Sequence, residues 1–203
     1  MSAFPVLIRA RVDAYGLQVA DDLIAQLGAY LGLLARWNRR INLTSFDLDT
    51  PTDAAIDRLI VEPLRAAAFV RDGDRLAVDV GSGGGSPAIP IALACPRLHM
   101  TLVEVRARKA AFLREAVRTL ALTGARVEAV AFGALAGDSS LAKQVDVVTM
   151  RAVRADREIW TTIDALLAPR GQVLWLGGDP EAIETTTFAP VAHEDAVLVI
   201  ARR

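Results

Sequence analysis

Apolar positions recur at helical spacing in the first third of the chain. Between residues 20 and 38 they follow a period of about 3.6 residues, at Leu23, Ile24, Leu27, Leu31, Leu34 and Ala35. The segment 51–70 has a helical pattern too, with an irregularity at Pro63, because proline lacks the N–H that continues a helix. These patterns predict a helical amino-terminal extension over residues 1–70.

The pattern changes at residue 76, where short apolar runs begin to alternate with helical segments. Strands are predicted near 76–80, 100–104, 126–131, 145–150, 171–176 and 196–201, and helices near 87–94, 107–121 and 156–167. This alternation is typical of a mostly parallel sheet covered by helices on both faces. The sequence therefore predicts an α/β domain over residues 71–203, which forms one compact unit with the extension.

A glycine-rich turn follows the first predicted strand, where residues 76–85 read Leu-Ala-Val-Asp-Val-Gly-Ser-Gly-Gly-Gly. Glycine adopts positive φ readily and lets the main chain approach a ligand closely. A dinucleotide loop of the form G-x-G-x-x-G needs Gly or Ala at position 86, where the chain has Ser86. The spacing of Gly81, Gly83 and Gly85 instead fits the G-x-G-x-G turn of methyltransferases that use S-adenosylmethionine.

An acidic residue, Glu104, closes the next predicted strand about 20 residues after the glycine turn. Nucleotide-binding folds place a ribose-binding carboxylate at this position, where it can accept hydrogen bonds from both ribose hydroxyls. The turn and the acid together predict an S-adenosylmethionine site that includes Gly81, Ser82, Gly83, Gly85 and Glu104.

Composition limits the other possibilities. The chain has 203 residues, of which 53% are hydrophobic, and a net charge of -1. No apolar run approaches the roughly 20 residues that span a bilayer, and Arg9, Arg11 and Asp13 interrupt the start of the chain before a secretory signal can form. We therefore expect a cytoplasmic protein. With one cysteine, Cys95, and two histidines, neither a disulfide nor a metal site is expected.

Basic residues are clustered, although the net charge is too small for a polycation that coats nucleic acid. The clusters are Arg36, Arg39 and Arg40, next Arg106, Arg108, Lys109, Arg114 and Arg118, and last Arg151, Arg154 and Arg157. The last two clusters follow predicted strands, on the side where open α/β sheets bind ligands. A solvated surface is the alternative for each cluster.

Further motifs accompany the glycine turn and extend over nearly the whole chain. They are Trp37-Asn38, Asn42-Leu43-Thr44, Asp79-Val80-Gly81 with Pro87 and Pro90, Leu102-Val103-Glu104, Arg108-Lys109 with Ala111-Phe112-Leu113-Arg114, Asp146-Val147-Val148 with Arg151-Ala152, and Leu167-Ala168-Pro169 with Gly171. With them the chain resembles the bacterial small-subunit ribosomal RNA guanine-N7 methyltransferases, also called glucose-inhibited division protein B. The resemblance implies the Rossmann-like class I methyltransferase fold with an antiparallel last strand, S-adenosylmethionine as cofactor, and ribosomal RNA or the small subunit as partner.

The chain departs from this family's pattern mainly in its substrate half. Leu59 and Glu62-Pro63 replace a His and a following Asp-Ser, Phe132-Gly133-Ala134 replaces an Arg-Ala-Glu-like turn, no Lys precedes Gly177, and Gly84, Ser86 and Ala88 replace Ala, Phe and Gly. Guanine N7 has an exposed lone pair, so methyl transfer to it needs placement rather than a general base. Lys and Arg supply most non-specific affinity for RNA, so the departures are expected to affect RNA recognition first.

The resemblance and the positions along the chain together assign residues to the site. Cofactor contacts are expected from Asp79, Gly81, Ser82, Gly83, Gly85, Glu104, Phe132, Gly133 and Arg151, and RNA contacts from Arg36, Arg39, Arg40, Asn42, Arg108, Lys109 and Arg154. Arg151 is the candidate at the boundary of cofactor and substrate. Trp37 is expected to seat the extension on the sheet, and Asn42 and Thr44 either order a turn or approach the substrate base.

Three classes of function fit the sequence. They are a ribosomal RNA methyltransferase, a diverged methyltransferase for another nucleic acid or a small molecule, and a non-catalytic module that binds the cofactor or RNA. The first is favoured, and a dehydrogenase is disfavoured by Ser86. The expected state is a monomer.

Overall fold

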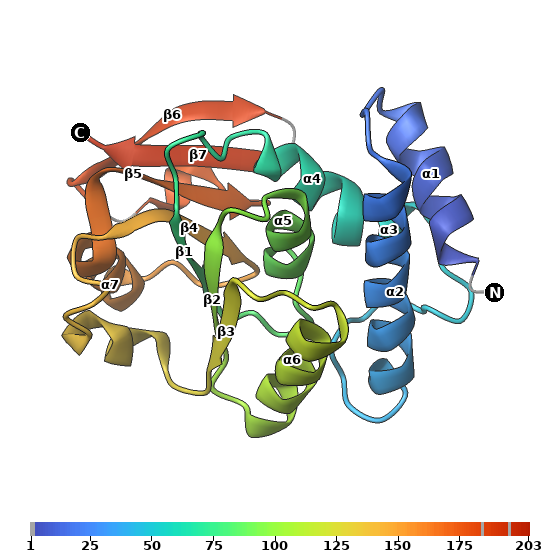
Figure 1. Cartoon of the computed structure of the whole chain (residues 1–203). Coiled ribbons are helices and arrows are strands. Elements are labelled where there is room, and N and C mark those ends of the chain that lie inside the picture. The colour runs from blue at the N-terminus through green and yellow to red at the C-terminus, as the bar shows by residue number, and fades with distance from the viewer. Residues whose placement is uncertain (1–2, 184, 195) are drawn as a thin grey trace.

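A twisted seven-stranded sheet forms the centre of the protein (Figure 1), and the computed structural model describes residues 3–183, 185–194 and 196–203. The strand order is β3-β2-β1-β4-β5-β7-β6, in which the first five strands are parallel and β7 runs antiparallel to both of its neighbours. The strands are β1 (Leu76–Val80), β2 (His99–Val103), β3 (Ala125–Glu128), β4 (Val145–Arg151), β5 (Leu167–Leu176), β6 (Phe188–Glu194) and β7 (Val197–Arg202). The carboxyl ends of β1, β2 and β4 therefore lie side by side.

Both faces of the sheet are buried, because successive residues of the central strands enter different hydrophobic cores. Val147 belongs to one core and its neighbour Val148 to the other. Helices α5 (Ala88–Ala94) and α6 (Ala107–Thr119) contribute to the first core, and α7 (Arg157–Leu166) and a 3-10 helix, η2 (Phe132–Gly137), contribute to the second. This burial explains why the strand sequences are continuously apolar.

The helical extension packs into the first core, beside α5 and α6 (Figure 1). Its elements are α1 (Phe4–Ala14), α2 (Asp21–Asn38), α3 (Asp53–Ile56), a π-helical turn, η1 (Asp57–Val61), and α4 (Glu62–Ala67). The buried face of α2 includes Leu27, Leu31 and Leu34, as its apolar period predicts.

The irregularity predicted at Pro63 is the junction of η1 and α4. The N–H of Glu62 bonds to the carbonyl of Asp57, five residues back, and so leaves the carbonyl of Arg58 outside the usual helical pairing. Pro63 has no N–H to offer the carbonyl of Leu59. Two adjacent backbone carbonyls are therefore available to partners outside the helix.

Sequence patterns missed two elements and misplaced some boundaries. Helix α1 and edge strand β6 were not predicted, and β5 begins at Leu167 rather than near residue 171. The third strand ends at Glu128, before the predicted residue 131. Among the described residues, no helix is long and apolar enough to cross a membrane.

Candidate cofactor and substrate site

The turn after β1 has the conformation that its glycines predict. Gly81, Gly83 and Gly85 have φ values of 66°, 51° and 88°, in the left-handed region that disfavours other residues. The N–H of Ser82 donates to the carbonyl of Val103 at 2.9 Å, so the turn is held to the end of β2. The backbone of the turn thus lies beside the residues that follow β2.

Glu104 is the first residue after β2, and its carboxylate is held against the turn. Its Oε2 accepts the N–H of Gly83 at 3.0 Å, and its Oε1 accepts the N–H of Arg106 at 2.8 Å. Only 7% of the residue is exposed. A carboxylate offers about four acceptor positions, so both oxygens keep acceptor capacity for a ligand with two hydroxyls.

Asp79 lies within β1 and is almost fully buried, with 1% exposure. Its Oδ1 accepts the hydroxyl of Thr149 at 2.6 Å, whereas its Oδ2 has no hydrogen-bond partner. Burial raises the pKa of Asp79 to about 6, against the opposing effects of hydrogen bonds from Thr149 and Ser82 and the charge of Arg151. A buried, ionised and unpartnered oxygen fits a cationic ligand group.

Arg151 ends β4 and joins the sheet to the extension. Its guanidinium donates to the carbonyl of Arg58, to Ser86 Oγ at 3.2 Å and to Glu62 Oε2 at 2.9 Å. The hydroxyl of Ser86 donates to the carbonyl of Leu59 at 3.0 Å. Both carbonyls released by the π-helical turn and Pro63 are therefore satisfied by residues of the site.

Two arginines share the carboxylate of Glu62. Arg58 Nη1 donates to Glu62 Oε2 at 2.9 Å, the same oxygen that Arg151 contacts. Burial lowers the pKa of Arg151 to about 10, which still leaves it protonated at neutral pH. The cluster of Arg58, Glu62 and Arg151 therefore carries a net charge of about +1.

Arg58 is the more accessible arginine of this cluster. Its side chain is 35% exposed, compared with 9% for Arg151. A β-carbon at Gly177, directly after β5, would lie 3.1 Å from Arg58 Nη2. A guanidinium of the extension thus stands at the end of β5, where the sequence itself has no basic residue.

Helix α2 forms a further wall of the glycine turn. The hydroxyl of Tyr30 donates to the carbonyl of Gly84 at 2.7 Å, and a β-carbon at Gly84 would lie 2.9 Å from the carbonyl oxygen of Leu43. The following turn is ordered by Asn38, whose Oδ1 accepts the N–H groups of Leu43 and Thr44. Thr44 in turn accepts the N–H of Phe46 at 3.3 Å, which is a turn-ordering role.

The residues predicted near the adenine lie at the start of η2. Phe132 is 8% exposed and belongs to the second hydrophobic core. Gly133 lies against α7, since a β-carbon there would be 2.8 Å from Glu158 Oε1. Both follow β3, next to β2 in the sheet.

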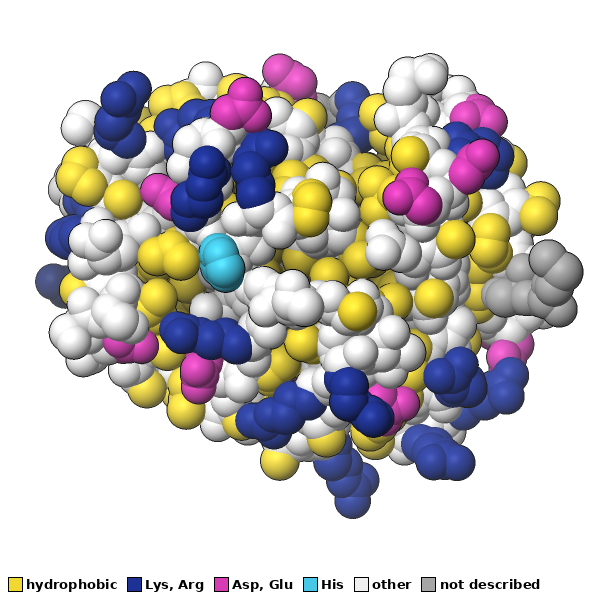
Figure 2. Space-filling view, viewed as in Figure 1, with side chains coloured by type: hydrophobic (Ala, Val, Ile, Leu, Met, Phe, Trp, Pro, Cys, Tyr) yellow, Lys and Arg dark blue, Asp and Glu magenta, His cyan; other side chains and the backbone are white. Residues whose placement is uncertain are grey.

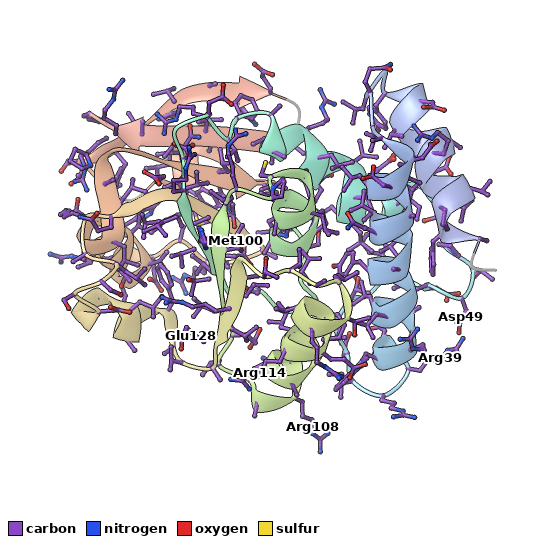
Figure 3. The ribbon with its side chains drawn as sticks, viewed as in Figure 1. Arg39, Asp49, Met100, Arg108, Arg114 and Glu128 are labelled. Atoms are coloured by element: carbon purple, nitrogen blue, oxygen red, sulfur yellow. The ribbon has the colours of Figure 1, made fainter. Side chains whose placement is uncertain are left out.

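The predicted RNA-binding residues lie in three places around the carboxyl ends of the strands. Arg36, Arg39, Arg40 and Asn42 lie at the end of α2 and just after it, Arg108 and Lys109 in the first turn of α6, and Arg154 after β4. Arg39 is paired with Asp49 at 2.5 Å, and Figure 3 shows these two side chains together. Lys109 Nζ would lie 4.0 Å from a β-carbon at Gly83, so this cation stands beside the glycine turn.

Sequence reasoning missed several residues that shape the site. Tyr30, Asn38, Arg58 and Thr149 all act through hydrogen bonds to the residues already described. Thr149 had a detectable signal, since it interrupts a buried apolar strand beside the strand of Asp79. The role of Arg58 had none, because it depends on the π-helical turn.

The strand order, the glycine turn and the carboxylate after β2 define a class I methyltransferase that uses S-adenosylmethionine. A solved structure with a similar fold is a predicted O-methyltransferase from Agrobacterium tumefaciens, with a TM-score of 0.56 and 20% identity over 70% of this chain and 79% of that chain. The family model of GidB, rRNA small subunit methyltransferase G, matches residues 23–198, and the chain belongs to that family. This confirms the predicted fold, enzyme class and cofactor.

Curated relatives extend over most of the chain. The ribosomal RNA small subunit methyltransferase G of Coxiella burnetii is 32% identical over 188 residues, which are 92% of this chain and 88% of the relative. The protein of the same name from Xylella fastidiosa is 40% identical over 81% of this chain and 74% of the relative. The family resemblance seen in the motifs is therefore confirmed.

Proposed function

We propose that the protein transfers a methyl group from S-adenosylmethionine to N7 of a guanine in small-subunit ribosomal RNA. Family membership supports the reaction class and the substrate class. The single observation that carries the cofactor assignment is the carboxylate of Glu104, which is bonded to the N–H of Gly83 in a turn of positive φ. The enzyme would act in the cytoplasm, and as a monomer, since one chain supplies all the residues of the site.

The residues around the turn fit S-adenosylmethionine, which supplies an activated methyl group. Glu104 would bind the ribose hydroxyls with its remaining acceptor positions, and Asp79 Oδ2 would bind the cationic amino acid part. Gly81, Ser82, Gly83 and Gly85 would bring backbone close to that part. Phe132 and Gly133 would border the adenine, and Arg151 the substrate side.

Methyl transfer to guanine N7 needs no group that removes a proton. The task of the protein is to hold the purine in line with the methyl group and to keep water out. The cluster of Arg58, Glu62 and Arg151 lies at the ends of β4 and β5, where it can donate to guanine O6 while N7 stays open. Because Arg58 is the exposed member, it is the cation of this cluster that the base would reach.

The cluster also reduces the force of the departures from the family pattern. Glu62 keeps a carboxylate between two arginines, and Arg58 places a positive charge beside Gly177. Charge at the substrate side is therefore retained by a different residue. This favours a ribosomal RNA substrate over a diverged small-molecule substrate.

The proposal is tested with labelled S-adenosylmethionine and small ribosomal subunits from a strain without the native enzyme. We expect one labelled guanine, identified as the N7-methyl nucleoside by mass spectrometry, and loss of label with the Glu104→Ala variant. Naked ribosomal RNA in parallel identifies the preferred form of the substrate. Cofactor binding by calorimetry without labelling of subunits or RNA would overturn the substrate assignment.

A further inference from the structure

A groove of about 540 Å³ lies between the end of α2 and the first part of α6. Its volume falls within the range of ligand pockets, roughly 300 to 1,000 Å³. Its lining residues are Arg36, Trp37, Arg40, Ile41, Arg108, Ala111 and Glu115. The groove therefore combines an apolar floor with three cations and one acid.

The cations of this groove are not neutralised by the protein. Within the described part of the chain, Arg36, Arg40 and Arg108 form no ion pair, whereas the adjacent Arg39 is paired with Asp49. Figure 2 shows Lys and Arg side chains gathered along the edge of the molecule over α6 and the end of α2, and Figure 3 shows Arg108 at that edge. Even with Glu115, the groove keeps a charge of about +2, which fits a polyanion.

An aromatic ring lies in the groove and is held from behind. Trp37 is half-buried and packs edge to face on the fully buried Phe112, with ring centroids 5.8 Å apart and an interplanar angle of 64°. Trp37 thus seats α2 on α6, as its sequence context predicts, and also presents surface to the groove. A fixed aromatic side chain beside arginines is the combination that binds unpaired bases and their phosphates.

The groove lies next to the glycine turn. Leu34 and Leu43, on either side of the groove residues in sequence, both contact Gly84. Arg108 is four residues after Glu104, and Lys109 stands between the groove and Gly83. A strand that enters the methyl-transfer site can therefore continue into the groove.

We propose that this groove binds single-stranded RNA adjacent to the target guanine, with a base on Trp37 and phosphates on Arg36, Arg40 and Arg108. The inference rests on the proposed function and names the part of the substrate that a second site holds. It predicts that affinity for unpaired RNA depends on the groove even without the cofactor.

The test measures binding of a fluorescent single-stranded RNA octamer by anisotropy at several salt concentrations. We expect the double variant Arg40→Gln/Arg108→Gln to lose at least about tenfold in affinity. Its slope of log affinity against log salt should fall by about 1.4, at roughly 0.7 per phosphate contact. The matched control is Arg114→Gln/Arg118→Gln, which removes the same charge from exposed positions of α6 outside the groove, and it should change affinity less than twofold.

A second measurement tests the aromatic contact. Trp160 and Trp175 are 2% and 6% exposed, so RNA that reaches a tryptophan should quench Trp37, and Trp37→Phe should abolish the quenching. Equal affinity of the groove and control variants, or equal binding of an RNA duplex of the same length, would overturn the inference. Cofactor binding and subunit labelling by the wild type report on the proposed function separately, because neither uses the octamer.

Discussion

The buried carboxylate of Asp79 allows a quantitative test of the cofactor site. Asp79→Asn keeps the shape of the side chain and an oxygen that accepts the hydroxyl of Thr149, but it removes the negative charge. In the folded protein the pKa of Asp79 is about 6, compared with 3.8 for an ordinary aspartate. At about 1.4 kcal/mol per pH unit, this difference corresponds to about 3 kcal/mol.

The sign of the effect follows from proton linkage. Between pH 3.8 and about 6 the folded state holds the Asp79 proton more tightly than the unfolded state, so stability falls as the pH rises through this window. The asparagine variant lacks this loss. From pH 5 to pH 8, wild type should lose about 1.4 kcal/mol of unfolding free energy relative to Asp79→Asn. A cationic ligand group beside Asp79 requires the ionised form, so cofactor affinity should be about tenfold lower at pH 5 than at pH 7.

Urea denaturation without cofactor, at pH 5 and pH 8, measures the first effect, and calorimetric titration with S-adenosylmethionine measures the second. The two histidines are present in both proteins, so their titration cancels in the difference. Asp79→Asn should bind the cofactor weakly and without this pH dependence. Parallel pH profiles of wild type and variant, in stability and in affinity, would refute the reasoning.

Three further changes test the walls of the site. Glu104→Gln should weaken cofactor binding by about tenfold to a hundredfold in calorimetry, because it removes charge-assisted hydrogen bonds worth roughly 1.5 to 3 kcal/mol, and an unchanged affinity would contradict the ribose assignment. Tyr30→Phe leaves the carbonyl of Gly84 without its 2.7 Å bond and should cost about 1 to 3 kcal/mol in urea denaturation, whereas no loss would show that water replaces the hydroxyl. Gly85→Ala places a β-carbon at φ 88° and 2.5 Å from Ile89 Cδ1, so we expect a loss of about 1 to 2 kcal/mol or more and a lower melting temperature, and an unchanged melting temperature would exclude that strain.

Most of the fold followed from patterns in the sequence, because buried strands and amphipathic helices leave strong local signals. The missed elements have weak ones. Helix α1 buries only Phe4, Ile8 and Val12, and these are mixed with the apolar but exposed Val6. Strand β6 lies at the sheet edge, contains Pro190 and has one buried residue, Phe188, so its pattern does not alternate clearly.

The site divides in the same way. The glycine turn and Glu104 were predictable because a local backbone conformation and a strand end determine their positions. The cluster around Arg151 was not, because its partners come from segments 65 to 93 residues away in the chain. Its geometry depends on which backbone carbonyls lack helical partners, and no side-chain pattern records that.

Pro63 explains why the extension belongs to the active site rather than beside it. A regular helix through this segment would use its own N–H groups to satisfy the carbonyls of Arg58 and Leu59. The π-helical turn and the proline remove those donors, and the guanidinium of Arg151 and the hydroxyl of Ser86 replace them. The extension is thereby tied to the end of β4 and to the glycine turn at once. Residues that look like losses at the substrate side are therefore part of a single bonded unit, and a change in any one of them acts on both cofactor and RNA positions.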